Sequence, residues 1–150
     1  MNILKKSISH YPQGLWIALF ALLLIFLAWL MQAYSLLDWE GAVKLGVQDE
    51  SFTGGSVEYA IADVERGIAI ADIVWVLPIT IVAFIGLLRM KFIGFVAAMM
   101  VFAICVYFPL FYAFRISMHF DIVLAAILLW AIPSLLGIIG LWMNRRIFKD

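Results

Sequence analysis

Residues 14–37 read "GLWIALFALLLIFLAWLMQAYSLL" and decide the fold class, because this stretch contains no charged side chain. At a helical rise of about 1.5 Å per residue, about 20 apolar residues cross the hydrocarbon core of a membrane. Backbone groups within lipid must be satisfied inside the segment, and the residue alternation of a membrane β-barrel is absent. The stretch therefore predicts a membrane-spanning α-helix.

Three further apolar stretches have the same character and lie at residues 67–88, 92–114 and about 120–143. Hydrophobic residues make up 67% of the 150-residue chain, and its mean hydropathy is +1.11. Soluble domains are about half apolar, so this composition is typical of a multi-pass membrane protein. The short connections after the second and third spans favour antiparallel neighbours. We expect one all-α integral membrane domain over residues 1–150, built as an antiparallel bundle of four transmembrane helices.

The distribution of charge predicts the orientation of this bundle. Basic residues gather at the chain ends and between the second and third spans: Lys5, Lys6, Arg89, Lys91, Arg145, Arg146 and Lys149. Acidic residues other than Asp150 fall on the opposite side: Asp38, Glu40, Asp49, Glu50, Glu58, Asp63, Glu65, Asp72 and Asp121. The positive-inside rule then places both termini in the cytoplasm and the protein in the plasma membrane, with membrane lipids at its basic rim.

One substantial segment lies outside the predicted spans, at residues 38–66, and we call it the acidic segment. Its "AVKLGVQ" stretch, residues 42–48, alternates apolar and polar residues, which indicates a strand or an interfacial segment. From Ser56 the pattern becomes helical, with Ser56 as a suitable N-cap and Glu58 in the first turn. We expect one helix over residues 56–88, extended beyond the membrane on the extracytoplasmic side.

An aspartate, Asp72, lies inside the second span. Glu58, Glu65 and Asp72 are spaced seven residues apart, so a helix directs all three toward one side. An ionisable group within the membrane is expected to face the bundle interior or a wet cavity. The spacing therefore predicts an inward-facing carboxylate at Asp72.

Other polar residues fall at a similar predicted depth, and they define a candidate pocket that opens to the extracytoplasmic side. Its members are Asp72, Glu65, Arg115, Tyr107, Tyr112 and Gln32. A purely structural alternative pairs Asp72 with Arg115 to hold neighbouring helices together. A metal site at Glu65, Asp72 and His119 is a further alternative, but no compact ligand spacing supports it. We expect neither a metal nor a cofactor.

The prolines and small residues predict details of helix packing. Pro78, Pro109 and Pro133 each remove a backbone donor inside a span, so bends are expected near Pro78 and Pro133. The pairs Gly67/Ala71 and Gly94/Ala98 have the small-x-x-x-small spacing that permits close helix approach, which is compatible with a homo-oligomer.

Three functional hypotheses remain open at this point. The favoured one is an accessory or interaction subunit whose acidic segment meets another membrane or extracytoplasmic protein. The alternative is a membrane enzyme or binding protein for a lipid- or quinone-like amphiphile that is held near Asp72. A weaker alternative is an oligomeric transporter or channel. The residues contain no nucleophile–base constellation, which favours a protein that is not an enzyme, and nothing indicates nucleic acid as a partner.

Overall fold

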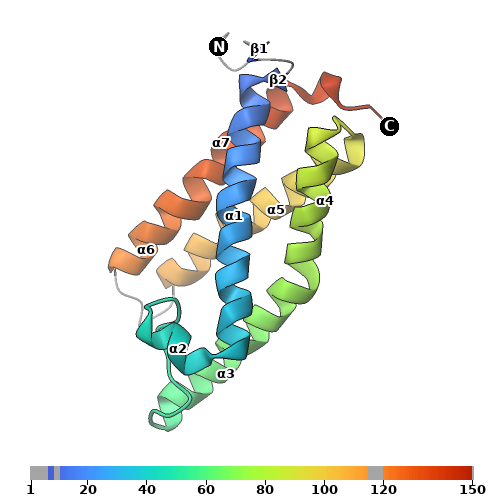
Figure 1. The fold of residues 1–150 in the computed structure, drawn as a ribbon. Coiled ribbons are helices and arrows are strands. Elements are labelled where there is room, and N and C mark those ends of the chain that lie inside the picture. Colours follow the sequence, from blue (N-terminus) through green and yellow to red (C-terminus); the bar gives the residue numbers. More distant parts are fainter. Residues whose placement is uncertain (1–6, 9–10, 115–119, 150) are drawn as a thin grey trace. The chain divides into compact units, whose positions relative to one another are not determined.

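A computed structural model of the chain describes residues 7–8, 11–114 and 120–149, and Figure 1 shows its helical architecture. The chain forms two compact units. We call Phe26–Pro78 the central unit, and Met1–Ile25 together with Ile79–Asp150 the terminal unit. Helix α1 (Gln13–Leu37) contributes to both, because the boundary between the units falls within it.

Four helices in the described ranges are long and apolar enough to cross a membrane: Gln13–Leu37, Ser56–Leu88, Phe92–Phe111 and Val123–Met143. These helices confirm the prediction of an all-α protein with four segments that are long and apolar enough to span a membrane. The second of them is continuous from Ser56 to Leu88, as expected, and comprises α3 (Ser56–Ala71), the π-helical turn η2 (Asp72–Val76) and α4 (Leu77–Leu88).

In the terminal unit, α5 (Phe92–Phe114) follows α4 after a short turn and packs against the fourth span. That span comprises α6 (Phe120–Ala126), the π-helical turn η3 (Ile127–Ala131) and α7 (Ile132–Met143). The 3₁₀ turn η4 (Arg145–Ile147) follows α7. A short hairpin of β1 (Ser7–Ile8) and β2 (Tyr11–Pro12) precedes α1.

Close helix crossings in the terminal unit depend on glycine. A Cβ added to Gly86 would overlap the Cα of Gly94 and lie 2.7 Å from its backbone nitrogen, so α4 and α5 touch backbone to backbone. Similarly, a Cβ on Gly140 would lie 2.6 Å from the carbonyl oxygen of Gly14. Gly94 therefore takes part in a close approach, as its spacing predicted, but the partner is Gly86 of the preceding helix. A Cβ added to Gly67, by contrast, would meet no atom of another element within 4 Å.

A π-helical turn precedes two of the three prolines in the spans. Leu77 N–H donates to the carbonyl of Asp72 just before Pro78, and Ile132 N–H donates to Ile127 just before Pro133. The extra residue in each turn compensates for the missing proline donor and moves the preceding carbonyl away from the ring. Both turns end in the same pattern, "WVLP" at 75–78 and "WAIP" at 130–133. Pro109, by contrast, lies inside an uninterrupted α-helix.

In the central unit, the acidic segment begins with α2 (Trp39–Lys44). Asp38 caps this helix, because its carboxylate accepts a hydrogen bond of 2.9 Å from Gly41 N–H. The expectation of a strand over residues 42–48 is therefore wrong at its start, because the cap at Asp38 begins a helix that includes residues 42–44. The alternative of an interfacial segment stays a prediction. A turn and an irregular stretch follow until α3 begins.

Candidate functional site

The long second span buries one row of side chains at helical spacing, which we call the buried row. Its members are Ala62, Glu65, Ala69, Asp72 and Val76. Two carboxylates, Glu65 and Asp72, thus lie on the same inward side of the helix, as their spacing predicted. Glu58 is exposed instead, and its carboxylate accepts a hydrogen bond from the backbone N–H of Gly55 at the start of α3. The buried acidic row therefore contains Glu65 and Asp72 but not Glu58.

Asp72 combines burial with an unusual backbone position. Its side chain is only 6% exposed, and its Oδ2 atom is buried without a hydrogen-bond partner among the described residues. Asp72 also begins η2, and single π-helical turns occur frequently at functional sites. A carboxylate in an apolar environment is costly unless a donor or a counter-charge satisfies it. Asp72 Oδ2 is therefore a buried acceptor that no described residue satisfies.

Gln32 takes part in a different polar cluster. The Nε2 atom of Gln48 donates to Gln32 Oε1 at 3.0 Å and to Ser35 Oγ at 3.2 Å. Ser35 in turn donates to the carbonyl of Met31 at 3.1 Å. Gln48 and Ser35 are both buried. This cluster ties the acidic segment to α1. Gln48 was not predicted as a partner of Gln32, because the two residues are sixteen positions apart in the chain.

The remaining predicted pocket residues are not joined to Asp72 by the described structure. Tyr107 lies on α5 in the terminal unit, and its side chain is 63% exposed. Tyr112 also belongs to α5, but its side chain lies outside the described part of the chain, as do Arg115 and His119. A polar layer that unites these residues with Asp72, Glu65 and Gln32 therefore stays a prediction.

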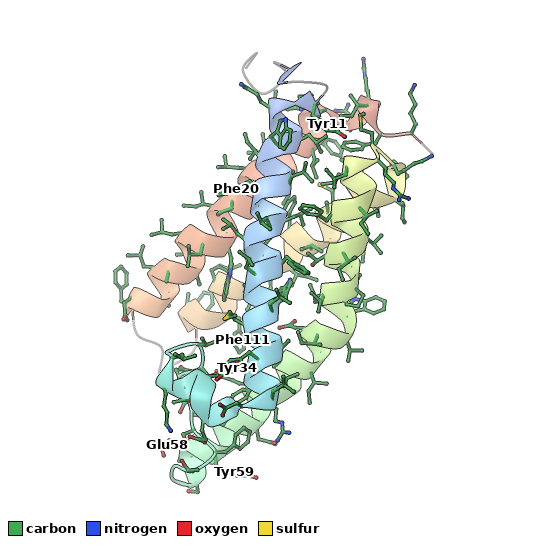
Figure 2. All side chains as sticks on the ribbon, viewed as in Figure 1. Tyr11, Phe20, Tyr34, Glu58, Tyr59 and Phe111 are labelled. Atoms are coloured by element: carbon green, nitrogen blue, oxygen red, sulfur yellow. The ribbon has the colours of Figure 1, made fainter. Side chains whose placement is uncertain are left out.

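Carboxylates of the acidic segment hold that segment in shape. Glu40 accepts hydrogen bonds from Ser51 Oγ at 2.9 and 3.0 Å and from Phe52 N–H at 3.1 Å. Asp38 accepts one from the Tyr34 hydroxyl at 3.2 Å, in addition to capping α2. Figure 2 labels Tyr34 and, on α3, Glu58 and Tyr59. Glu40 and Asp38 thus have structural partners within this segment. The side chains of Asp49 and Asp63 are exposed.

An aromatic cluster provides the core of the acidic segment. Trp39 is 8% exposed, and its Nε1 donates to the carbonyl of Glu50 at 2.7 Å. Phe52 meets Trp39 edge to face at 5.3 Å between ring centroids and meets Tyr59 at 5.2 Å. The guanidinium of Arg66 lies 5.7 Å from the Phe52 ring centroid. This cluster packs α2 and the following turn onto α3.

A second row on the long helix is exposed rather than buried, and we call it the exposed row. It follows the same helical spacing and consists of Val57, Ala60, Val64, Gly67, Ala71 and Val74. Val57 is 70% exposed and Val64 is 61% exposed. Apolar side chains at helical spacing form a continuous strip on one side of a helix. The central unit thus carries an exposed apolar strip that runs along α3 and into η2.

The described residues contain no group of three histidine, cysteine, aspartate or glutamate side chains that could hold a metal ion. The alternative site at Glu65, Asp72 and His119 includes a residue outside those ranges. Comparisons with protein-family models, curated proteins and solved structures found no match for this chain.

Proposed function

We propose that this small multi-pass membrane protein is an accessory or interaction subunit, and that its acidic segment and the adjoining exposed row of α3 bind a partner protein. The exposed row is the observation that carries the proposal. It is apolar, and it begins in the part of the helix that also bears exposed charged residues.

The length of the second span supports an extramembrane position for the first turns of α3. Its 33 residues extend for about 50 Å at helical rise, compared with a hydrocarbon core of about 30 Å. Glu58, Asp63 and Arg66 are exposed at one end of this helix, so the excess length is best accommodated there. In our proposal this end is extracytoplasmic, and both termini face the cytoplasm of a plasma-membrane protein.

Exposed valines on a projecting helix are the chemical basis for a protein partner. Val74 can face lipid, but Val57 and Val64 would face water in the free protein, which is unfavourable for apolar side chains. A partner helix or loop that covers them would remove this cost. Glu58 and Asp63 lie beside the exposed row, so basic residues on the partner would complement it.

Photo-crosslinking tests this proposal. Benzoylphenylalanine at Val64 is expected to give a discrete protein adduct in the native membrane. The matched control is the same residue at Ile93, which is apolar and 62% exposed but lies on α5 in the terminal unit, outside the proposed binding surface. Asp63→Lys and Ala60→Leu should each reduce the adduct at Val64, by charge repulsion and by steric overlap respectively.

The adduct mass identifies the class of partner, because a second copy adds 17.0 kDa and a different protein adds another value. Lipid adducts alone at Val64, or equal protein adducts at Val64 and Ile93, would contradict the proposal.

A second candidate function rests on the buried Oδ2 atom of Asp72. In this proposal the central unit binds a lipid- or quinone-like amphiphile whose hydroxyl or amine donates to Asp72. Ala69 and Val76, which precede and follow Asp72 in the buried row, are apolar and suited to the ligand's hydrocarbon part.

Asp72→Asn is expected to reduce co-purified amphiphile by roughly tenfold, because hydrogen bonds to a charged acceptor are about twice as strong as neutral ones. Mass spectrometry of extracted lipids from protein purified in mild detergent measures this change. Asp63→Asn, on the exposed side of the same helix, is the matched control and should leave the amphiphile content unchanged. An unaltered lipid profile in Asp72→Asn, or failure of that variant to assemble, would favour a structural role.

A further inference from the structure

Helices α4 and α7 repeat one pattern of buried residues. Each helix buries a hydroxyl residue, a small residue, a glycine and a leucine at positions i, i+3, i+6 and i+7. These residues are Thr80, Ala83, Gly86 and Leu87 in α4, and Ser134, Gly137, Gly140 and Leu141 in α7. The glycine at i+6 lies against the backbone of another helix in both cases, Gly86 against Gly94 and Gly140 against Gly14. Both helices are therefore anchored in the terminal unit by the same kind of crossing.

A π-helical turn and a proline precede this pattern in both spans. The turns η2 and η3 each end two residues before the proline, Pro78 or Pro133, and each has tryptophan as its fourth residue. Sharp bends in helices occur mainly at prolines and π-turns, because both interrupt the regular hydrogen-bond ladder. The second and fourth spans therefore each have one point, at the same place in the pattern, where the helix can change direction.

The turn η3 is held in place by its neighbour. It packs against α5 inside the terminal unit. Trp130, its fourth residue, meets Phe108 of α5 edge to face with 5.9 Å between ring centroids. Edge-to-face aromatic contacts add stabilisation beyond the burial of the rings. This contact opposes a change of direction at η3.

The turn η2 differs from η3 at the corresponding positions. Trp75, its fourth residue, is 63% exposed. Its first residue is Asp72, where η3 has Ile127, and the buried Oδ2 atom of Asp72 has no partner among the described residues. A buried acceptor without a donor is unfavourable, so a change at η2 that brings Oδ2 to a donor or to water would lower the free energy of that carboxylate.

The division of the chain into compact units agrees with this difference. The boundary in the second span falls between Pro78 and Ile79, directly after η2, whereas the whole of η3 belongs to the terminal unit. We infer that η2 is a hinge at which α3 bends relative to α4, and that η3 is its fixed counterpart in the fourth span.

The hinge gives the exposed row a means of acting on the rest of the span. Most of that row lies on α3, beyond η2, so a bend displaces it relative to the anchored α4. A partner that binds one bend more tightly would shift the helix toward that bend. The hinge itself requires no partner, so it can be tested separately from the proposed function.

Electron paramagnetic resonance distances across each turn test the hinge in the full chain, reconstituted in lipid nanodiscs. Ile70→Cys with Ile85→Cys places spin labels on either side of η2, and Leu124→Cys with Ile139→Cys places them on either side of η3. All four side chains are 43–48% exposed, and each pair is fifteen residues apart, about 22 Å at helical rise. Cys105, the single native cysteine, is replaced by alanine in both proteins. We expect a broad or two-component distance distribution across η2 and a single narrow one across η3.

Substitutions at the two turns test the cause of this difference. Asp72→Ile gives η2 the first residue of η3 and removes the unsatisfied carboxylate, so the distribution across η2 should lose its broad component. Pro78→Ala restores the missing backbone donor and should have the same effect. Trp130→Ala removes the contact with Phe108 and should broaden the distribution across η3.

Equal widths of the two distributions in the otherwise unmodified protein would overturn the inference. A broad distribution across η2 that persists in both Asp72→Ile and Pro78→Ala would also overturn it. The comparison between the two label pairs needs neither substitution, so it remains decisive if one of these variants fails to assemble. Size-exclusion profiles show which variants remain folded.

Discussion

Gly86→Ala is expected to lower the free energy of unfolding by about 3 kcal/mol, which is the upper end of the usual cost of overpacking. The added methyl group would overlap the Cα of Gly94 and contact its backbone nitrogen at 2.7 Å. Side-chain rotation cannot relieve an overlap with backbone, so α4 and α5 must move apart. Gly94→Ala should have a similar effect, because its Cβ would meet the backbone of Gly86 and Leu87.

Gly67→Ala is the matched control, because Gly67 is also helical but a Cβ added there would meet no atom of another element within 4 Å. Alanine is the better helix former by up to about 1 kcal/mol, so this variant should be unchanged or slightly more stable. Unfolding of the purified protein in mixed micelles with increasing sodium dodecyl sulfate compares the three variants. If Gly86→Ala and Gly67→Ala unfold at the same detergent fraction, the close crossing of α4 and α5 is wrong.

Trp39→Ala is expected to destabilise the acidic segment by about 3–5 kcal/mol, the usual cost of truncating a buried tryptophan. The change removes the edge-to-face contact with Phe52 and the 2.7 Å hydrogen bond to Glu50. Because Trp39 joins α2 to α3, its loss should release residues 45–55 from their packed position. Hydrogen–deuterium exchange over these residues should accelerate, while exchange in α5 of the terminal unit stays unchanged.

Trp39→Phe separates the two contributions of this side chain. Phenylalanine keeps an aromatic ring in the core but lacks the indole donor, so a loss of about 1 kcal/mol is expected. Equal exchange in wild type, Trp39→Phe and Trp39→Ala would show that this aromatic cluster does not hold the segment.

Local sequence was sufficient to predict the helical spans. Residues 14–37 were expected and Gln13–Leu37 are observed; residues 92–114 were expected and Phe92–Phe114 are observed. The continuous helix over residues 56–88 was also predicted. Such agreement is understandable, because a long apolar segment in lipid can satisfy its backbone only within itself. Helical spacing also predicted that Glu65 and Asp72 share a buried side.

The secondary structure of residues 42–44 and the burial of Glu58 were predicted less well. Residues 42–44 alternate in polarity but are helical, because the Asp38 cap and the packing of Trp39 determine α2. Glu58 has the same seven-residue spacing as Glu65 and Asp72, yet it is exposed, because it lies in the first turn and binds the backbone of Gly55. The burial of a row of side chains stops where the neighbouring elements stop. Periodicity along one helix does not indicate where that is.

The sequence by itself determined the four apolar helices, the long second span and the inward carboxylate at Asp72, because each depends on residues within a few turns of one another. Only the tertiary structure decided which distant groups meet. It joined Gln48 to Gln32 and Ser35, Gly86 to Gly94, and Lys149 to the turn beside Lys91. These contacts form when separate segments pack together. Hydropathy does not indicate which polar side chain or which stretch of backbone one segment will meet on the other.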